Sequence, residues 1–158
     1  PKGTYPFAMY QWKLSGEREN IRMVSISDNT VLNEFLPKLL ETGKSVQMPA
    51  CVDKTYWEKV EQIHHACWEK ALAEHKAKTR EMIGYKEASL RTSHMARMAV
   101  LEEQLKKNNG NRMYIQMTEG KKRIAQEDFD LHMRQLQVAE QKADVLFELL
   151  AYGIVTVE

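Results

Sequence analysis

The sequence predicts an α+β protein that is mostly α-helical. It favours a long antiparallel helical hairpin, a coiled-coil arm, on a small base with an antiparallel β-sheet of about three strands. All four prolines lie before residue 50, which permits very long helices in the rest of the chain. Two stretches rich in helix formers then meet at the polar segment 108–111, a turn typical of antiparallel helices.

Composition limits the classes of protein that fit. The chain has 158 residues, of which 43% are hydrophobic and 28% charged, so general disorder is excluded. The formal net charge is +1, so nucleic-acid binding needs a local patch of charge. No apolar run approaches about 18 residues, so no membrane partner is expected. The only cysteines, Cys51 and Cys67, indicate reduced thiols and a cytoplasmic protein.

Residues 1–52 are predicted to form part of the base, as a β-hairpin followed by a short helix. The stretch "FAMYQWKL" alternates, which places Ala8, Tyr10, Trp12 and Leu14 on one face. "SGEREN" is a polar turn, and "IRMVSIS" is rich in β-branched residues. "DNTVLNEFLPKLLETG" is expected to form a short helix that Asp28 caps and that ends before Gly43, kinked or divided at Pro37. Residues 44–52 show no periodicity and are expected to form a loop.

Residues 53–151 are predicted to form the long α-hairpin arm, with its tip near 108–111. Asp53 is the expected N-cap of the first helix, and Gly153 is expected to end the second. Apolar residues at steps of three and four mark a seam on each helix. In the first helix these are Leu90, His94, Met98, Leu101 and Leu105. In the second they are Phe129, His132, Leu136, Ala139, Ala143, Leu146 and Leu150.

Residues 152–158 are predicted to form a C-terminal strand that returns to the base. We expect Ile154 to Val157 to join the N-terminal hairpin as an edge strand. The chain begins with Pro1, and we interpret it as a piece of a longer protein.

No catalytic, cofactor-binding or metal-binding residue is predicted. The sequence has no GxxxxGK[ST], GxSxG, HExxH or GxGxxG motif. His64, His65, Cys67 and Cys51 lack the paired spacing of a zinc site, so half-buried structural roles are favoured. Aromatic residues at helical spacing are better explained as core than as a platform for nucleic-acid bases. These residues are Tyr56, Trp57 and Trp68.

A cluster of basic residues near the arm tip is the candidate nucleic-acid contact. Its members are Lys106, Lys107, Arg112, Lys121, Lys122 and Arg123. Such a cluster can hold phosphates, but Glu102, Glu103 and Glu119 lie nearby, so a solvated arm surface is the competing interpretation. His132 has two interpretations, a pH switch or a histidine that the seam simply tolerates. The nine methionines indicate an adaptable packing surface.

The last seventy residues resemble the end of large bacterial Swi/Snf-type helicases related to RapA. The resemblance lies in "SLRTSHMARMAVLEEQLKK", a break, and "MTEGKKRIAQEDFDLHMRQLQVAEQKADVLFELLAYGIVTVE". It implies a non-catalytic C-terminal accessory domain, acting in interaction or positioning, whose partners are the helicase motor, DNA or RNA, and another protein at the arm tip. It also implies ATP and magnesium for the parent chain only. A freestanding coiled-coil adaptor that binds another protein is the alternative.

Overall fold

The computed structural model describes residues 2–46 and 54–158. The chain divides into two compact units. The first, the sheet unit, comprises Pro1–His75 and Asp144–Glu158, and the second, the hairpin unit, comprises Lys76–Ala143. The chain is mostly helical with one antiparallel sheet, so the predicted α+β class is confirmed.

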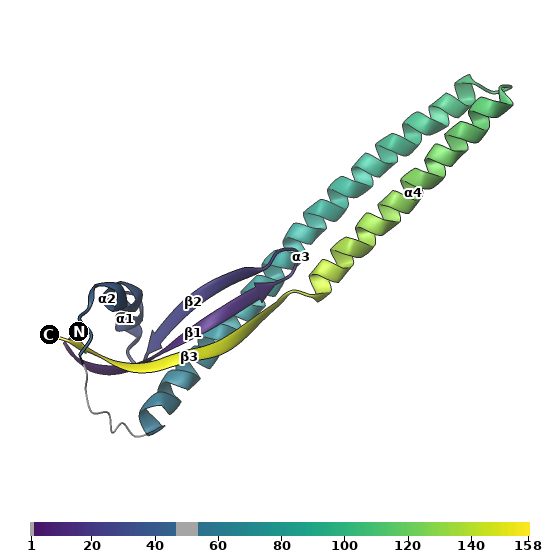
Figure 1. Cartoon of the computed structure of the whole chain (residues 1–158). Helices are drawn as coiled ribbons and strands as arrows, with labels where there is room; N and C mark the ends of the chain where they lie inside the picture. Colours follow the sequence, from purple (N-terminus) through teal and green to yellow (C-terminus); the bar gives the residue numbers. More distant parts are fainter. Residues whose placement is uncertain (1, 47–53) are drawn as a thin grey trace. The chain divides into compact units, whose positions relative to one another are not determined.

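The sheet unit is built on three antiparallel strands with β1 in the middle (Figure 1). These strands are β1 (Gly3–Ser15), β2 (Asn20–Ser27) and β3 (Asp144–Val157). β1 pairs with β2 through Phe7 opposite Ser27, and with β3 through Pro6 opposite Ile154. The predicted hairpin and the predicted pairing of Ile154 to Val157 with it are therefore confirmed.

One face of the sheet forms the core, as the alternation in β1 predicts. Ala8, Tyr10 and Trp12 are buried and Leu14 is partly buried. They pack with the first part of the long helix α3 (Lys54–Lys107), which contributes Val60 to the same cluster. A strand whose alternate residues face a helix buries one apolar set and leaves the other toward solvent, which fixes the register of the sheet.

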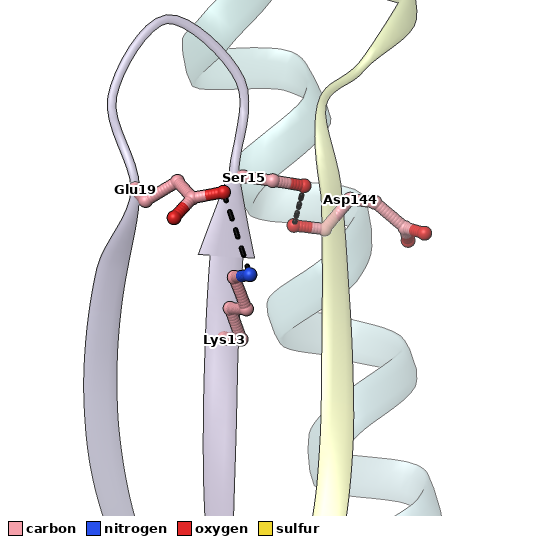
Figure 2. Close-up of polar contacts among 4 residues, drawn as sticks. All are labelled: Lys13, Ser15, Glu19 and Asp144. Carbon is pink, nitrogen blue, oxygen red and sulfur yellow. Dashed lines mark hydrogen bonds and ion pairs between the residues drawn. The ribbon is translucent and has the colours of Figure 1, made fainter.

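Polar contacts join the strands at one end of the sheet, where β1 ends and β3 begins. Figure 2 shows Lys13 Nζ 3.4 Å from a carboxylate oxygen of Glu19, across the β1–β2 turn. It also shows the Ser15 hydroxyl donating to the backbone carbonyl of Asp144 at 3.5 Å. The Ser15 carbonyl lies 2.6 Å from Nε2 of His75 on α3. These contacts hold the two strands and the helix together where the strands β1 and β3 meet.

The segment after β2 forms two short helices, as the position of Pro37 predicts. They are α1 (Thr30–Asn33) and α2 (Leu36–Thr42), with Pro37 in the first turn of α2. The expectation that Asp28 caps the first helix is wrong. Asn29 is the cap, because its side chain accepts hydrogen bonds from the backbone N–H groups of Val31 and Leu32. The expected loop at 44–52 and the N-cap at Asp53 fall largely or wholly on 47–53, outside the described residues.

The hairpin unit pairs the distal part of α3 with α4 (Arg112–Gln141), and the two helices run antiparallel. Gly110, in the turn, has φ +117°, a backbone conformation that glycine adopts without strain. Ion pairs cross between the helices, from Arg80 to Glu140 at 3.1 Å and from Arg97 to Asp128 at 3.7 Å. The predicted tip near 108–111 is confirmed.

The seam between the two helices follows an eleven-residue spacing, not a heptad. The steps 4, 4 and 3 recur on both helices, and every seam residue is buried or half-buried. The α3 residues are Thr79, Ile83, Glu87, Leu90, His94, Met98, Leu101 and Leu105, and the α4 residues are Tyr114, Thr118, Lys122, Ala125, Phe129, Met133, Leu136 and Glu140. Eleven residues per three turns gives 3.67 residues per turn, which produces a straight or slightly right-handed pair.

The eleven-residue spacing corrects part of the predicted seam. The five α3 residues predicted are on the seam, and so are Phe129 and Leu136. His132 is exposed, however, and its place is taken by Met133, which is 8% exposed. Phe129 stacks on His94 with ring centroids 4.3 Å apart, which anchors the register between the helices.

The predicted helix over 142–151 is wrong, because α4 ends at Gln141 and β3 already begins at Asp144. Leu146 and Leu150 are therefore exposed strand residues, not seam residues. Leu, Glu and Ala favour a helix locally. The edge of β1 that does not pair with β2 offers free backbone groups along the strand, and pairing with this edge overrides the local preference. Gly153 does not end a helix either. A Cβ there would lie 2.4 Å from the Phe7 ring, so glycine permits the close approach.

Candidate functional site

The six predicted cationic residues lie on both sides of the hairpin turn. Lys106 and Lys107 are in the last turn of α3, where positive charge is favourable to the helix dipole. Arg112 is the first residue of α4, where positive charge is unfavourable to the dipole, and the first turn of α4 holds no acidic residue. Helix stability therefore does not explain why the first residue of α4 is an arginine. Lys121, Lys122 and Arg123 follow further along α4.

Carboxylates neutralise half of this basic cluster. Three intraprotein ion pairs are present: Lys107 to Glu103 at 3.3 Å, Lys122 to Glu102 at 3.7 Å, and Arg123 to Glu127 at 4.0 Å. Within the described residues, no ion pair forms at Lys106, Arg112 or Lys121. Of the six residues in the cluster, these three can contact phosphates without first losing an ion pair to a carboxylate.

The histidine and cysteine residues weighed as metal ligands do not converge. Among the described residues, no group of three His, Cys, Asp or Glu side chains could hold a metal ion. His64 is buried, His65 pairs with Glu69 at 3.1 Å, and Cys67 is exposed. Cys51 lies outside the described residues.

The tryptophans of α3 belong to the sheet unit's interior rather than to an open stacking platform. The indole N–H of Trp68 donates to the Val145 carbonyl at 2.7 Å, and that of Trp57 to the Phe7 carbonyl at 3.3 Å. Both rings are half-buried, so the predicted core role is confirmed for these two. The side chain of Tyr56 lies outside what is described.

An aromatic cluster surrounds His64, a buried polar residue of the sheet unit. The His64 ring stacks on Tyr10 with centroids 3.5 Å apart and planes 8° apart. Its Nε2 accepts from the Trp12 indole N–H at 2.9 Å, so the ring is neutral with its proton on Nδ1. The pKa of His64 is lowered to about 4, mainly by burial and also by the neighbouring His65, while Glu61 acts in the opposite direction. His64 therefore stays uncharged near neutral pH.

An open pocket of about 540 Å³ lies beside this cluster, within the sheet unit. Its lining comes from β1, from two turns of α3 and from β3. The lining residues are Tyr10, Glu58, Glu61, Gln62, His64, His65, Phe147 and Leu149. Part of this lining can be predicted from the sequence, since Glu58, Glu61 and His65 stand three and four residues apart on α3. The contributions of Phe147 and Leu149 could not be predicted, because that segment was expected to be helical.

Tyr10 brings an unsatisfied group to this pocket. Its ring is 3% exposed, and its hydroxyl has no hydrogen-bond partner among the described residues. The pKa of Tyr10 is raised to about 12, mainly by burial, with smaller contributions from Tyr152 and Glu61. The Tyr152 hydroxyl donates a short hydrogen bond to Glu61, which raises the pKa of Tyr152 to about 12 as well. Both phenols therefore keep their protons near neutral pH.

No family model, curated protein or solved structure matches this chain closely enough to show its family. Within the part of the chain that the structure describes, no helix combines the length and apolar character needed to cross a membrane.

Proposed function

We propose that this chain is a non-catalytic accessory domain of a bacterial Swi/Snf-type ATP-dependent helicase. The order of the C-terminal elements carries the proposal: a long helix ending at Lys107, a short turn, a second helix from Arg112 to Gln141, and a strand. The tail of the RapA-related helicases has the same order, a helical stretch, a break, a second stretch and a final strand. In this proposal ATP and magnesium bind the motor of the parent chain, which works in the cytoplasm. The hairpin itself acts in interaction with a partner or in positioning the nucleic acid.

The hairpin unit suits a positioning role because its helices are joined along their length. Ion pairs at Arg80–Glu140 and Arg97–Asp128 and the His94–Phe129 stack hold the two helices in one register. A pair of helices held at several levels bends less than one held at a single point. The basic residues that have no carboxylate partner lie toward one end of this pair, around the turn, which makes DNA or RNA a suitable partner there.

The coding frame that contains this chain tests the proposal directly. We expect the same frame to encode a phosphate loop with its lysine and a DExx-type magnesium motif upstream of residue 1. A frame without these motifs would overturn the helicase proposal. It would leave the adaptor as the remaining candidate.

A shortened hairpin tests the positioning role in the parent chain. Residues 91–101 of α3 and 122–132 of α4 face each other and each comprise one eleven-residue repeat. Deleting both segments shortens the hairpin while every remaining seam residue keeps its face. We expect ATP hydrolysis by the motor to persist and nucleic-acid translocation or remodelling to fall. Unchanged translocation would contradict a positioning role.

The second candidate is a freestanding adaptor that binds another protein through the hairpin. Exposed methionines on the hairpin unit favour it: Met82, Met95, Met113 and Met117 are 47–77% exposed. Methionine surfaces adapt to different partners. Replacing Met113 and Met117 near the turn with glutamine should weaken protein binding in this case, and should leave nucleic-acid binding unchanged.

A further inference from the structure

We propose that the free edge of β3 pairs with the same edge of a second copy of this chain, which joins two three-stranded sheets into one sheet of six strands. The two copies are related by a two-fold axis perpendicular to the sheet, so the two β3 strands run antiparallel. This surface lies in the sheet unit, and the inference does not rest on the function proposed for the hairpin.

β3 is an edge strand with one open side. The sheet order is β2–β1–β3, so β1 pairs with one side of β3 and no strand pairs with the other among the described residues. At the start of β3, side chains bond to both backbone groups of Val145: Asp144 accepts from its N–H at 2.9 Å, and the Trp68 indole donates to its carbonyl at 2.7 Å. Over 146–157, no described side chain hydrogen-bonds to the backbone in this way. Unpaired backbone groups of an edge strand are a template for another strand.

The residues of this edge do not prevent such pairing. Edge strands are commonly protected by lysine, by proline or by a covering helix or loop. β3 contains no lysine, arginine or proline, and its seven consecutive residues 146–152 are all exposed, with Glu148 as the one charged residue among them. β2, the other edge strand, carries Arg22 and is contacted by α1 and α2. β3 is therefore the more open edge of the sheet.

The core layer is incomplete over β3. Residues opposite each other on neighbouring strands lie on the same face of a sheet. Three residues of β3 stand opposite buried core residues of β1, so they lie on the core face, yet they are 39–45% exposed. These pairs are Phe147 with Trp12, Leu149 with Tyr10, and Tyr152 with Ala8. In a six-stranded sheet the same residues of the second copy lie beside them, which removes apolar area from water.

A bulge in the middle of β3 sets the register of the pairing. Leu149 stands opposite Tyr10 and Ala151 opposite Met9, so Leu150 is the extra residue. Odd-numbered residues of β3 therefore face the core before the bulge, and even-numbered residues face it after the bulge. Two antiparallel copies keep their core faces together when the two bulges meet, with Leu150 of each copy opposite Ala151 of the other.

This register also matches the charges and the apolar side chains. β3 has two charged residues, and Asp144 then lies opposite Val157 and Glu148 opposite Gly153, so no like charges face each other. Apolar residues face apolar residues on both sides of the sheet. These pairs are Leu146 with Val155, Phe147 with Ile154, and Leu149 with Tyr152. A second copy supplies both the matching bulge and the matching charge pattern, and it is therefore the occupant that fits this edge.

Sedimentation velocity of the full chain over about 1–100 μM tests the association, since this range covers a Kd of about 10 μM. We expect a monomer–dimer equilibrium. Lys13 provides a matched pair of variants, because its two cross-strand neighbours are Ile21 on β2 and Leu146 on β3, which are 59% and 57% exposed. Leu146→Lys should raise the Kd about ten-fold or more, because it places a charge in the new strand pairing. Ile21→Lys places the same charge beside Lys13 at the other edge and should leave the Kd unchanged.

Two further variants test the axis and the register. Leu150→Lys brings two lysines together near the two-fold axis and should abolish the dimer; circular dichroism checks that each variant is folded. Spin labels on Thr156→Cys, with Cys51 and Cys67 changed to serine, measure the register. Thr156 lies opposite Val145 of the second copy, so the two labelled positions are eleven strand residues apart, roughly 36 Å, whereas parallel pairing in register would place them about 5 Å apart.

Three results would overturn the proposal. The first is a folded chain that stays monomeric throughout this range, which would leave the edge to a strand of a different protein. The second is a dimer that Leu146→Lys and Leu150→Lys both leave intact, or that Ile21→Lys weakens as much as they do. The third is a label separation that fits parallel pairing.

Discussion

Two histidines on α3 show how one residue type serves opposite hydrogen-bonding roles in the sheet unit. Nε2 of His64 accepts from the Trp12 indole, whereas Nε2 of His75 must donate, because its partner is the Ser15 carbonyl. The two rings therefore carry their protons on different nitrogens. Each histidine links α3 to β1, and the links fall near Trp12 and at the end of the strand. A change of protonation at His64 would break the first link without touching the second.

We expect the stability of the sheet unit to fall as pH drops from about 6.5 to about 4. The pKa of His64 is lowered to about 4 in the folded protein, so in this range the unfolded chain binds a proton that the folded chain does not. Stability is thus fully present above the unfolded pKa of about 6.5 and is lost as pH falls toward the folded value. Urea unfolding of the wild type and His64→Gln between pH 7 and pH 5 measures this. Equal pH dependence in the two proteins would contradict the prediction.

The sequence predicts which residues of β1 are buried, but not how their polar atoms are satisfied. Alternation places Tyr10 and Trp12 on the core face, and the structure confirms it. The hydrogen-bond partner of the Trp12 indole is His64, 52 residues away, and the Tyr10 hydroxyl has no partner in the described part of the chain. Alternation depends on neighbours in the chain, whereas these outcomes depend on how α3 and β3 approach the sheet. The pocket was missed for this reason.

At the scale of elements, the hairpin unit shows how similar a heptad and an eleven-residue repeat are over a short stretch of helix. Over one or two turns, steps of three and four residues fit a heptad and an eleven-residue repeat equally well. From Phe129 to Leu136 both spacings take seven residues, as three plus four in the predicted heptad and as four plus three in the observed repeat. Both therefore include Phe129 and Leu136, and they differ only at the residue between, His132 or Met133. The seam residues predicted for α3, from Leu90 to Leu105, already follow the 4, 4, 3 steps.

Two neighbouring substitutions distinguish these spacings. Met133→Ala should cost about 2 kcal/mol or more, because the side chain is 8% exposed and its removal leaves a cavity in the seam. His132→Ala, one residue away on the exposed side, should change the free energy of unfolding by no more than about 0.5 kcal/mol. Urea unfolding measures both. A larger loss of stability for His132→Ala than for Met133→Ala would favour the heptad spacing instead.

The two halves of the basic cluster supply a matched pair of triple variants. If the turn contacts nucleic acid, replacing Lys106, Arg112 and Lys121 with glutamine should weaken duplex binding more than replacing Lys107, Lys122 and Arg123. The second set is already paired with carboxylates. Both changes should act alike on all base sequences, because phosphate contacts carry no sequence information.

Fluorescence anisotropy with labelled DNA and RNA duplexes at several salt concentrations measures the effect. Log K should fall by roughly 0.9 per neutralised phosphate for each tenfold rise in salt. Equal losses in the two variants would show that the internal ion pairs do not matter. An absence of binding at low salt would remove nucleic acid as the ligand of the turn.

The strand β3 was the element hardest to predict. Its segment "DVLFELLAYGIVTV" mixes helix formers with β-branched residues, and only the last part alternates. Pairing with β1 decides the conformation, over a register that runs from Gly3–Val157 to Ser15–Asp144. The sequence-based prediction covered the last six residues of the strand, 152–157, and assigned the first eight, 144–151, to a helix.

At the scale of the whole molecule, the fold class followed from the placement of proline and from the turn, whereas the function did not follow from any local motif. In our proposal, positioning and nucleic-acid contact belong to the hairpin unit, which holds the basic cluster around the turn.

We expect the purified chain to hydrolyse no ATP. Its sequence has no phosphate loop to cradle the β- and γ-phosphates by backbone N–H groups. A coupled assay with and without duplex DNA or RNA measures turnover, with an established ATP-dependent helicase as the positive control. Turnover above background that follows the chain through two further purification steps would refute the prediction.

The pairing of β1 with β3 has a consequence for synthesis on the ribosome. The Ser15–Asp144 contact joins residues 129 positions apart, and the strand in the middle of the sheet is the first one made. At typical elongation rates this leaves β1 with an open edge for on the order of ten seconds. During that time β2 is its sole neighbour, and Tyr10 and Trp12 have no complete core to enter. A nascent chain of this kind suits chaperones that shield exposed strands until β3 has been made.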